Sequence, residues 1–378
     1  MSLLKSWQLR ARLTHLFERA MKNWAWLLLI VGALFVRVLA TQKDWVENNY
    51  THGIYPLISR IQRYLFGWLP LSIGDWIYGA LSVIILLKTA WFFRDLVLKK
   101  INRATLVSGL QQLIFFFLFV YVFFNLGWGL NYNRQGIAKQ LSLQTDSFSV
   151  NQLDTLTRFL LQRANYFRSQ EQKGIRQQLK RKKNLFLQAQ ISFDSAAIQF
   201  PFLKMQAPSI KPSLYSYMGN YLGFQGYYNP FTGEGQVNTT IPIFVQPFVT
   251  THEMAHQIGF AKESEANFVG YLVCRKSPNL FFRYSAYLDM YLYAHGLLYQ
   301  LDSTRATSIN SSLSKLVAKD ILALKQFYQR YKNPLEDWIM VGYDYFLQAN
   351  QQPQGKYSYG QVTGWLLAWV RKEGWDAL

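Results

Sequence analysis

Cysteine is almost absent from the chain, since Cys274 is the only one among 378 residues. A single cysteine excludes an internal disulfide and any zinc cluster built from thiolates. Its apolar surroundings are typical of a small buried side chain. Histidine is scarce too, with five residues at positions 15, 52, 252, 256 and 295. A zinc site in this chain must therefore draw on these few imidazoles and on carboxylates.

Charge is also low, at 16% of residues, and acids are outnumbered: 21 Asp and Glu against 40 Lys and Arg give a net charge of +19. So few charges are unusual for a soluble enzyme, whereas 17% aromatic residues are typical of membrane-interface belts. The basic residues are dispersed, and no nucleic-acid-binding module surrounds the run at residues 180–183. We expect no nucleic-acid partner and interpret that run as a solvated helix face or a patch attracted to anionic lipid.

Three apolar stretches predict membrane spans at residues 24–40, 73–93 and 105–130, joined by short loops. The third has no charged residue and is long enough to cross a bilayer with tilt. Residues 1–23 form a basic segment before the first span. Residues 131–378 are expected to form one domain, which is large enough to bury its own core.

The distribution of basic residues predicts the orientation of these spans. The N-terminal segment carries five Lys and Arg, and the loop between spans two and three carries Arg94, Lys99, Lys100 and Arg103. Densely basic short segments stay in the cytoplasm, which places everything after about residue 131 outside. We therefore expect a multi-pass bacterial inner-membrane protein with a periplasmic domain and the lipid bilayer as its first partner.

Two of the five histidines lie in one string, His252-Glu253-Met254-Ala255-His256. On a helix, positions i and i+4 lie one above the other, so both imidazoles point at the same spot. Two neutral imidazoles at that spacing suit zinc, and the neighbouring glutamate can act on a water held by the metal. Gly259 follows three residues later and can end the helix in a left-handed conformation.

Zinc in hydrolytic sites usually has three protein ligands, and a second predicted helix at residues 263–272 offers the third. Glu263 and Glu265 both qualify by residue type. They lie about 200° apart around a helix, so only one of them can face the metal. The other is expected to be a solvated acid at a helix N-terminus.

The string from Glu263 to Asn267 resembles that of the gluzincin peptidases, whose third ligand opens a Glu-x-x-x-Asp/Asn pattern. The resemblance implies Glu263 as the ligand, with Glu265 as the fallback, and Asn267 as a residue that orients a histidine. The longer stretch 226–272, with YYNPFTGEGQVN and HEMAHQIGFAKESEANF, also resembles an uncharacterised bacterial family of multi-spanning membrane proteins with a zincin motif. That resemblance extends to the layout of N-terminal spans followed by an external domain.

The expected fold is an α-helical membrane region of three spans followed by a mainly α, α+β zincin-like domain with a small sheet. Residues 150–186 have apolar residues at helical spacing, and residues 281–301, 312–332 and 361–372 predict amphipathic helices. Residues 215–244 indicate turns and short strands. Within them, residues 235–243 are the expected edge strand for an extended substrate, because Pro242 suits an edge.

The predicted function is a membrane-anchored zinc metallopeptidase with a peptide or protein substrate. Zinc would activate a water molecule, and Glu253 would take its proton and pass it to the leaving amine. His295, Tyr343 and Tyr357 are candidate donors to the developing oxyanion, and Glu234 is expected to be a turn carboxylate or to position substrate. The alternative is an envelope scaffold or assembly factor that contains zinc but has no catalytic activity.

Overall fold

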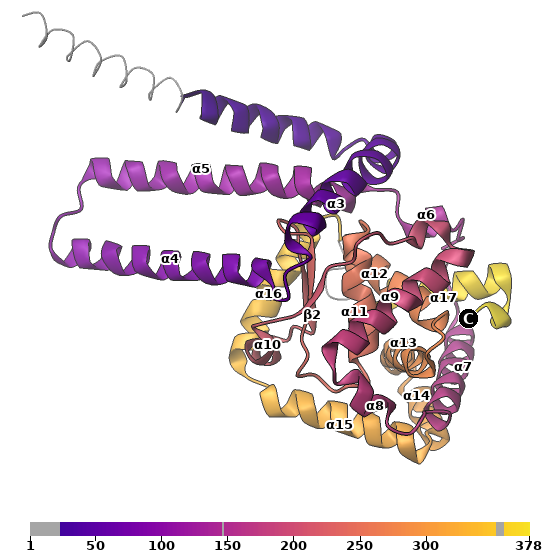
Figure 1. Ribbon diagram of the computed structural model, residues 1–378. Coiled ribbons are helices and arrows are strands. Elements are labelled where there is room, and N and C mark those ends of the chain that lie inside the picture. The colour runs from indigo at the N-terminus through magenta and orange to yellow at the C-terminus, as the bar shows by residue number, and fades with distance from the viewer. Residues whose placement is uncertain (1–22, 146, 353–358) are drawn as a thin grey trace, which may run out of the picture.

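The computed structural model describes residues 23–145, 147–352 and 359–378 (Figure 1). The described chain is mostly helical and contains one small sheet of three strands. A long helical hairpin projects from a compact body that holds the sheet and most of the helices (Figure 1). The mostly helical structure with one small sheet agrees with the coarse fold class expected from the sequence.

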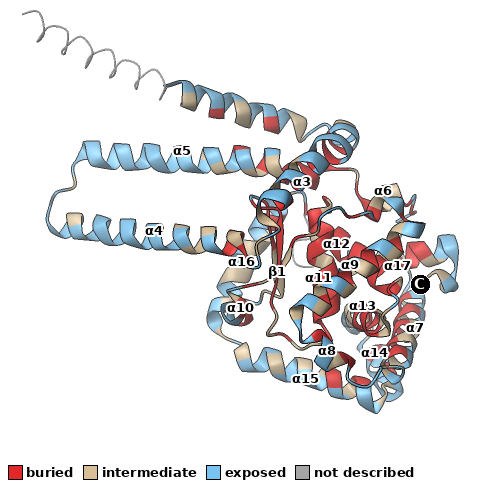
Figure 2. Ribbon diagram, viewed as in Figure 1, coloured by how far each residue is buried: buried red, intermediate tan, exposed pale blue. Residues whose placement is uncertain are grey.

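The hairpin consists of α4 (Ile73–Val97) and α5 (Arg103–Gly127), each long and apolar enough to cross a membrane. Their side chains are exposed along most of their length (Figure 2). The helix Asn23–Leu39 meets the same test only together with Lys43–Phe66, to which it is bent by 97°. Two spans, or three with this bent pair, therefore match the predicted segments, and their orientation stays a prediction.

The segment between the first and second predicted spans is helical and packs on the body. It contains α2 (Lys43–Trp45), the π-helical turn η1 (Val46–Ile54) and α3 (Tyr55–Phe66). Tyr50 and Tyr55 are buried in a cluster with Trp128, which follows α5 directly. The buried guanidinium of Arg134 lies 2.8 Å from the Glu47 carboxylate. The sequence did not predict this packing, because the partners of these side chains lie far along the chain.

The body is built from helices around one core, shown by the buried segments in Figure 2. The elements before the sheet are η2 (Gly129–Asn133), α6 (Ile137–Gln140), α7 (Val150–Ser169), α8 (Ile175–Leu179), α9 (Lys182–Gln199) and η3 (Pro201–Leu203). Those after the sheet are α11 (Gln246–Gln257), α12 (Glu263–Arg275), α13 (Leu280–Leu301), α14 (Ser303–Ile309), η4 (Asn310–Ser312), α15 (Lys315–Tyr331), α16 (Pro334–Ala349), α17 (Tyr359–Glu373) and η6 (Trp375–Ala377). The helices predicted at 281–301, 312–332 and 361–372 are thus confirmed as α13, α15 and α17.

The sheet has the strand order β1-β3-β2, with β1 (Ile210–Pro212) parallel and β2 (Gly226–Asn229) antiparallel to β3 (Glu234–Val237). The short helix α10 (Ser216–Leu222) connects β1 to β2. The expected edge strand at 235–243 is wrong, because β3 is central and fully buried and residues 239–240 form a turn. The edge strand beside α11 is β2.

Glu234 anchors the hairpin to the sheet. Its side chain is fully buried and accepts hydrogen bonds from the main-chain N–H groups of Ile73 at 3.3 Å and Gly74 at 2.7 Å. These are orphan donors at the N-terminus of α4, where a carboxylate is also favoured by the helix dipole. The expectation of a turn carboxylate is therefore corrected: Glu234 caps a candidate membrane span.

The buried Asp320 in α15 joins three helices and carries a prediction about stability. It accepts from Arg168 Nε at 2.8 Å, Arg176 Nη2 at 2.6 Å and Tyr284 Oη at 2.8 Å. Burial opposes ionisation, but the bonds from Arg176 and Tyr284 outweigh it and lower the pKa of Asp320. We expect Asp320→Asn to lower the free energy of unfolding in detergent by about 1.5–3 kcal/mol at pH 7, since it removes the charged acceptor of three hydrogen bonds while Glu171 still pairs with both arginines.

The stabilisation by Asp320 depends on pH in a defined direction. Because the folded pKa lies below the unfolded value, it is complete above about pH 4 and is lost as pH falls through the folded pKa. The difference between the parent chain and Asp320→Asn should therefore shrink in acid. Asp154→Asn is the control, since its pair with Arg158 is partly exposed and should contribute less than about 1 kcal/mol.

Candidate metal centre

The helix α11 carries the His-Glu-x-x-His string through the middle of the body. Nearly all of its residues are buried, and Pro247 in its first turn suits a helix start. It ends at Gln257, two residues before Gly259, whose φ of +88° is the left-handed conformation expected there. This turn brings the Phe260 carbonyl back to within 2.7 Å of His256 Nδ1.

Two histidines and one glutamate converge on a single point. Nε2 of His252 and Nε2 of His256 are 3.1 Å apart. Oε2 of Glu263, the first residue of α12, lies 3.3 Å from His252 Nε2, and its Oε1 lies 3.7 Å from His256 Nε2. One ligand atom from each residue falls within 4.8 Å of the others. The structure thus brings together the three residues that the sequence predicted as ligands.

This donor set fits zinc by chemistry and by spacing. In a tetrahedral site with bonds near 2.0–2.1 Å, ligand atoms are separated by about 3.3 Å, close to the separations of the two imidazole nitrogens and of His252 from Glu263. The Nδ1 of His256 donates to the Phe260 carbonyl, which leaves its Nε2 lone pair directed at the shared point. Two imidazoles and one carboxylate are the ligands of hydrolytic zinc sites.

The electrostatics of the cluster keep Glu263 ionised. Burial opposes ionisation, but the hydrogen bond and charge of His252 and the charge of His256 hold the Glu263 pKa at about 2. Burial lowers the pKa of His256 to about 4, so this imidazole is neutral. Burial disfavours the cationic form of His252, but the hydrogen bond and the charge of Glu263 outweigh this effect and raise the His252 pKa to about 9. The cluster therefore balances an anionic carboxylate with positive charge at the shared point.

Glu253 lies beside the cluster, under the edge of the sheet. Burial raises its pKa to about 8, with opposing effects from His252 and Glu263. Its Oε2 is buried and has no hydrogen-bond partner within the described parts of the chain. A Cβ atom at Gly226 would collide with its Oε1, so only glycine lets β2 approach this closely. Gly226 is a site residue that spacing rules did not identify.

The C-terminus of α11 is capped by side chains of α3 and by Trp128, which follows α5. The Gln257 carbonyl accepts from Tyr55 Oη at 2.9 Å, Ser59 Oγ at 3.1 Å and Arg63 Nη1 at 2.9 Å. The His256 carbonyl accepts from Trp128 Nε1 at 3.1 Å. These donors satisfy carbonyls that a helix end leaves unpaired, and the Arg63 charge suits the negative end of the helix dipole.

The three candidate oxyanion donors do not lie together in the structure. Tyr343 of α16 donates to Glu263 Oε1 at 2.8 Å, and burial followed by the Glu263 charge raises its pKa well above the usual value. It is therefore a protonated donor at the cluster. His295 belongs to α13, and its Nε2 lies 3.1 Å from the Ala306 carbonyl of α14, so its position gives no support for a role at the cluster. Tyr357 lies outside the described residues.

Glu265 and Asn267, the remaining predicted residues, point to opposite sides of α12. The Glu265 side chain is buried against Gly136, with Lys262 Nζ 3.7 Å from its Oε1, and it does not join the histidines. The expectation of a solvated acid at this position is therefore wrong. The Asn267 side chain contacts His252 and contributes to its raised pKa, as an orienting residue would. Asp289 of α13 was not predicted. Burial raises its pKa to about 7, and the charge of His252 opposes this rise.

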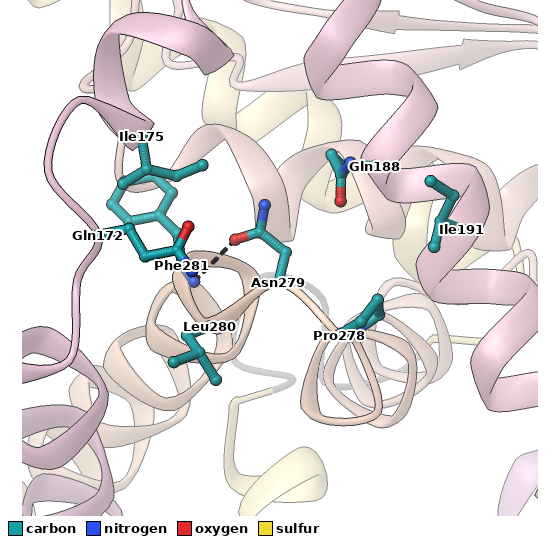
Figure 3. Close-up of a pocket in the computed structure, with 8 residues that line it drawn as sticks. All are labelled: Gln172, Ile175, Gln188, Ile191, Pro278, Asn279, Leu280 and Phe281. Atoms are coloured by element: carbon teal, nitrogen blue, oxygen red, sulfur yellow. Dashed lines mark hydrogen bonds between the residues drawn. The ribbon is translucent and has the colours of Figure 1, made fainter.

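A cavity of about 340 Å³ between α8, α9 and the start of α13 has no such chemistry (Figure 3). Its walls are formed by Gln172, Ile175, Gln188, Ile191, Pro278, Asn279, Leu280 and Phe281. Asn279 accepts from the Phe281 N–H at 2.9 Å and thereby caps α13. None of these side chains is a strong metal ligand or has an acid or base that titrates near neutral pH.

Helices of spanning length joined to a body with a His2Glu cluster define the general type of protein. The chain belongs to the family described as "Protein of unknown function (DUF3810)", which matches residues 50–367. The match covers the second half of η1, all of α3, both helices of the hairpin and the whole cluster. It agrees with the expected resemblance to an uncharacterised family. No curated protein and no solved structure shows significant similarity to the chain.

The geometry predicts which acid controls metal affinity. We expect Glu263→Gln to weaken zinc binding by at least about 100-fold, because the substitution removes an anionic ligand. Glu265→Gln is the matched control, two residues away on the same helix, and should leave zinc affinity unchanged. Competition with a chromophoric chelator measures both. Equal losses in the two variants would contradict the assignment of Glu263.

Proposed function

We propose that the chain is a membrane-anchored zinc metallopeptidase with its site at the α11–α12 cluster. The convergence of His252 Nε2, His256 Nε2 and Glu263 beside the buried Glu253 is the observation that carries this proposal. When bound by these three ligands, zinc would lower the pKa of a water molecule and polarise a substrate carbonyl. Neighbouring side chains would supply the proton transfer and the hydrogen bond to the developing negative charge.

Glu253 is the general base in this proposal. Burial raises the pKa of this carboxyl above its usual range, which is the direction required of a group that must both accept and return a proton near neutral pH. Its unpaired Oε2 would take the proton of the attacking water and deliver it to the leaving amine. Tyr343 Oη, which is held protonated next to Glu263, would donate to the negative charge that develops on the substrate carbonyl oxygen.

The open edge of β2 offers a place for an extended substrate. Asn238 N–H donates to the Gln225 carbonyl at 2.9 Å, next to the Gly226–Val237 pair. By the alternation of an antiparallel ladder, Tyr227 and Asn229 direct their main-chain groups at β3, and Gly226 and Tyr228 direct theirs outward. A peptide that pairs with these outward groups would lie directly over Glu253.

The proposed location is the bacterial inner membrane, with the cluster on the periplasmic side. The basic loop with Arg94, Lys99, Lys100 and Arg103 joins α4 to α5 at the end of the hairpin far from the body (Figure 1). If this loop stays in the cytoplasm, as basic loops do, the body and the cluster lie on the opposite side.

Glu253→Gln separates catalysis from metal binding. We expect zinc content and folding to remain, and kcat to fall by about 10²–10⁴, because the variant lacks the general base. A peptide-library cleavage profile of the full chain in detergent, together with elemental analysis for zinc, measures both quantities. Full function of this variant in cells would instead favour the scaffold or assembly-factor alternative.

Gly226→Ala tests the close approach of β2 to the base. The new Cβ must displace Glu253 or the strand, and a displacement of about 1 Å at a catalytic group can lower kcat about 100-fold. Gly296→Ala in α13 is the control, because a Cβ there meets no atom within 4 Å. Equal kcat values for both variants and the parent chain would refute the placement of Glu253 under β2.

A further inference from the structure

A second cavity lies between the hairpin and the sheet. It has a volume of about 340 Å³ and is walled by the first turns of α4, by α10 and by β2. Its lining includes Tyr78 and Ser82 of α4, Met218 and Leu222 of α10, and Gly226 and Tyr228 of β2. One wall therefore belongs to a candidate membrane span and the opposite wall to the open edge of the sheet.

The inner wall of this cavity is also the wall of the metal centre. Gly226 lines the cavity and lies directly over Glu253. Phe224 lines it too, and its ring packs edge-on against Tyr343 at 6.2 Å between centroids. The Tyr343 hydroxyl in turn contacts Glu263. The thickness of one side chain separates the cavity from the cluster.

The outer wall extends into the apolar length of α4. Ser82 lies nine residues after Ile73, which is about 13 Å along the helix axis. Tyr215, which also lines the cavity, donates from its hydroxyl to the Asp75 carbonyl at 2.7 Å, so the chain leading into α10 is fixed against α4. The cavity therefore lies beside the part of α4 that would enter the bilayer.

The elements around the cavity expose aromatic and apolar side chains. On α10 these are Tyr217, Met218 and Tyr221, and on α16 they are Leu335, Trp338, Val341 and Tyr345. Trp338 is 77% exposed and Tyr217 is 71% exposed, which is unusual for large rings facing water. Tyr and Trp are enriched where a protein meets the membrane–water interface.

This exposed surface is continuous with the hairpin. Phe346 of α16 packs on Phe124 of α5 at 6.4 Å between ring centroids. Asn333, the cap of α16, donates to the Tyr221 carbonyl of α10 at 2.7 Å. α16 thus has two faces: Tyr343 points at the cluster, and Trp338 and Tyr345 point outward. A bilayer around α4 and α5 would meet these outward side chains.

We propose that the substrates are polypeptides anchored in the bilayer, which reach the metal centre from the membrane interface through the cavity between α4, α10 and β2. An apolar side chain near the cleaved bond occupies the cavity while the main chain pairs with β2. This inference rests on the proposed peptidase activity and adds the substrate class and the route. A soluble peptide lacks the anchor that concentrates the substrate beside α4.

The test uses the full chain in phosphatidylethanolamine–phosphatidylglycerol vesicles. The probes are one random octapeptide mixture with N-terminal palmitoyl groups and the same mixture with N-terminal acetyl groups. We expect the palmitoylated mixture to be cleaved at least about tenfold faster, because anchoring raises the local concentration. Equal rates for the two mixtures would overturn the proposal.

A matched pair of variants tests the cavity itself. Ser82→Trp fills it and should lower cleavage of the palmitoylated mixture at least about tenfold, whereas Ala80→Trp should not. Ala80 lies about 200° away around α4, so the same substitution there faces away from the cavity. Equal rates in the two variants would overturn the route through the cavity.

Crosslinking separates this inference from the peptidase proposal. Palmitoylated octapeptides with photo-leucine are irradiated with the Glu253→Gln variant, and labelled segments are found by mass spectrometry. Labels on α4 and α10 that disappear in Ser82→Trp and persist in Ala80→Trp support the route. If such labels form but the parent chain cleaves neither mixture, only the peptidase proposal fails. Absence of labels on both helices overturns the route.

Discussion

The carbonyl groups at the C-terminus of α11 impose the constraint on which the rest of the structure depends. α11 is buried, so its last carbonyls must find donors within the protein. Those donors come from Tyr55, Ser59 and Arg63 of α3 and from Trp128 at the end of α5. The same turn contains His256, whose Nδ1 is fixed by Phe260. Elements next to the candidate spans therefore set the position and orientation of the His256 imidazole, a proposed metal ligand.

The sheet extends this coupling to Glu253, the proposed general base. One face of β2 and β3 packs on α11 at Glu253, and the other face holds the N-terminus of α4 through Glu234. The body and the hairpin thus pack on opposite faces of the same three-stranded sheet, which couples their positions. The unpaired Glu253 Oε2 is a cost of this tight packing, since an unsatisfied buried polar atom destabilises by about 1–3 kcal/mol. Such local instability is common where a residue is kept ready for chemistry.

The sequence predicted the ligands better than it predicted their surroundings. The i, i+4 histidines and Gly259 follow from helix geometry and local residue types. Glu263 was preferred to Glu265 because of the resemblance to the gluzincins, and the structure brings Glu263 to the two histidines. The apolar runs likewise predicted the hairpin helices. The edge strand was misplaced because β2 is only four residues long and its glycine suggested a turn, whereas the β-branched run after Gly235 looked more extended.

Other elements could not be predicted because their roles depend on distant partners. Polar residues of α3 cap α11. Periodicity in the sequence does not reveal this role, because it does not identify the partner of a polar side chain. α16 has apolar residues around most of its circumference, so no single buried face stands out, although Asn333 and Pro334 are a recognisable helix start. The need for glycine at position 226 follows only from the structure, which places Glu253 beneath it.

The spacing of these contacts along the chain has a consequence for biogenesis. The side chains of α3 that cap α11 come from residues 194 to 202 positions earlier, and Glu234 binds main-chain groups 160 and 161 positions earlier. Contacts of such high sequence separation form late, because a long loop must close before they are gained. During synthesis the hairpin emerges first and α11 long afterwards. Assembly of the His2Glu cluster is thereby coupled to correct placement of the hairpin, so a chain whose hairpin is misplaced would not complete its metal centre.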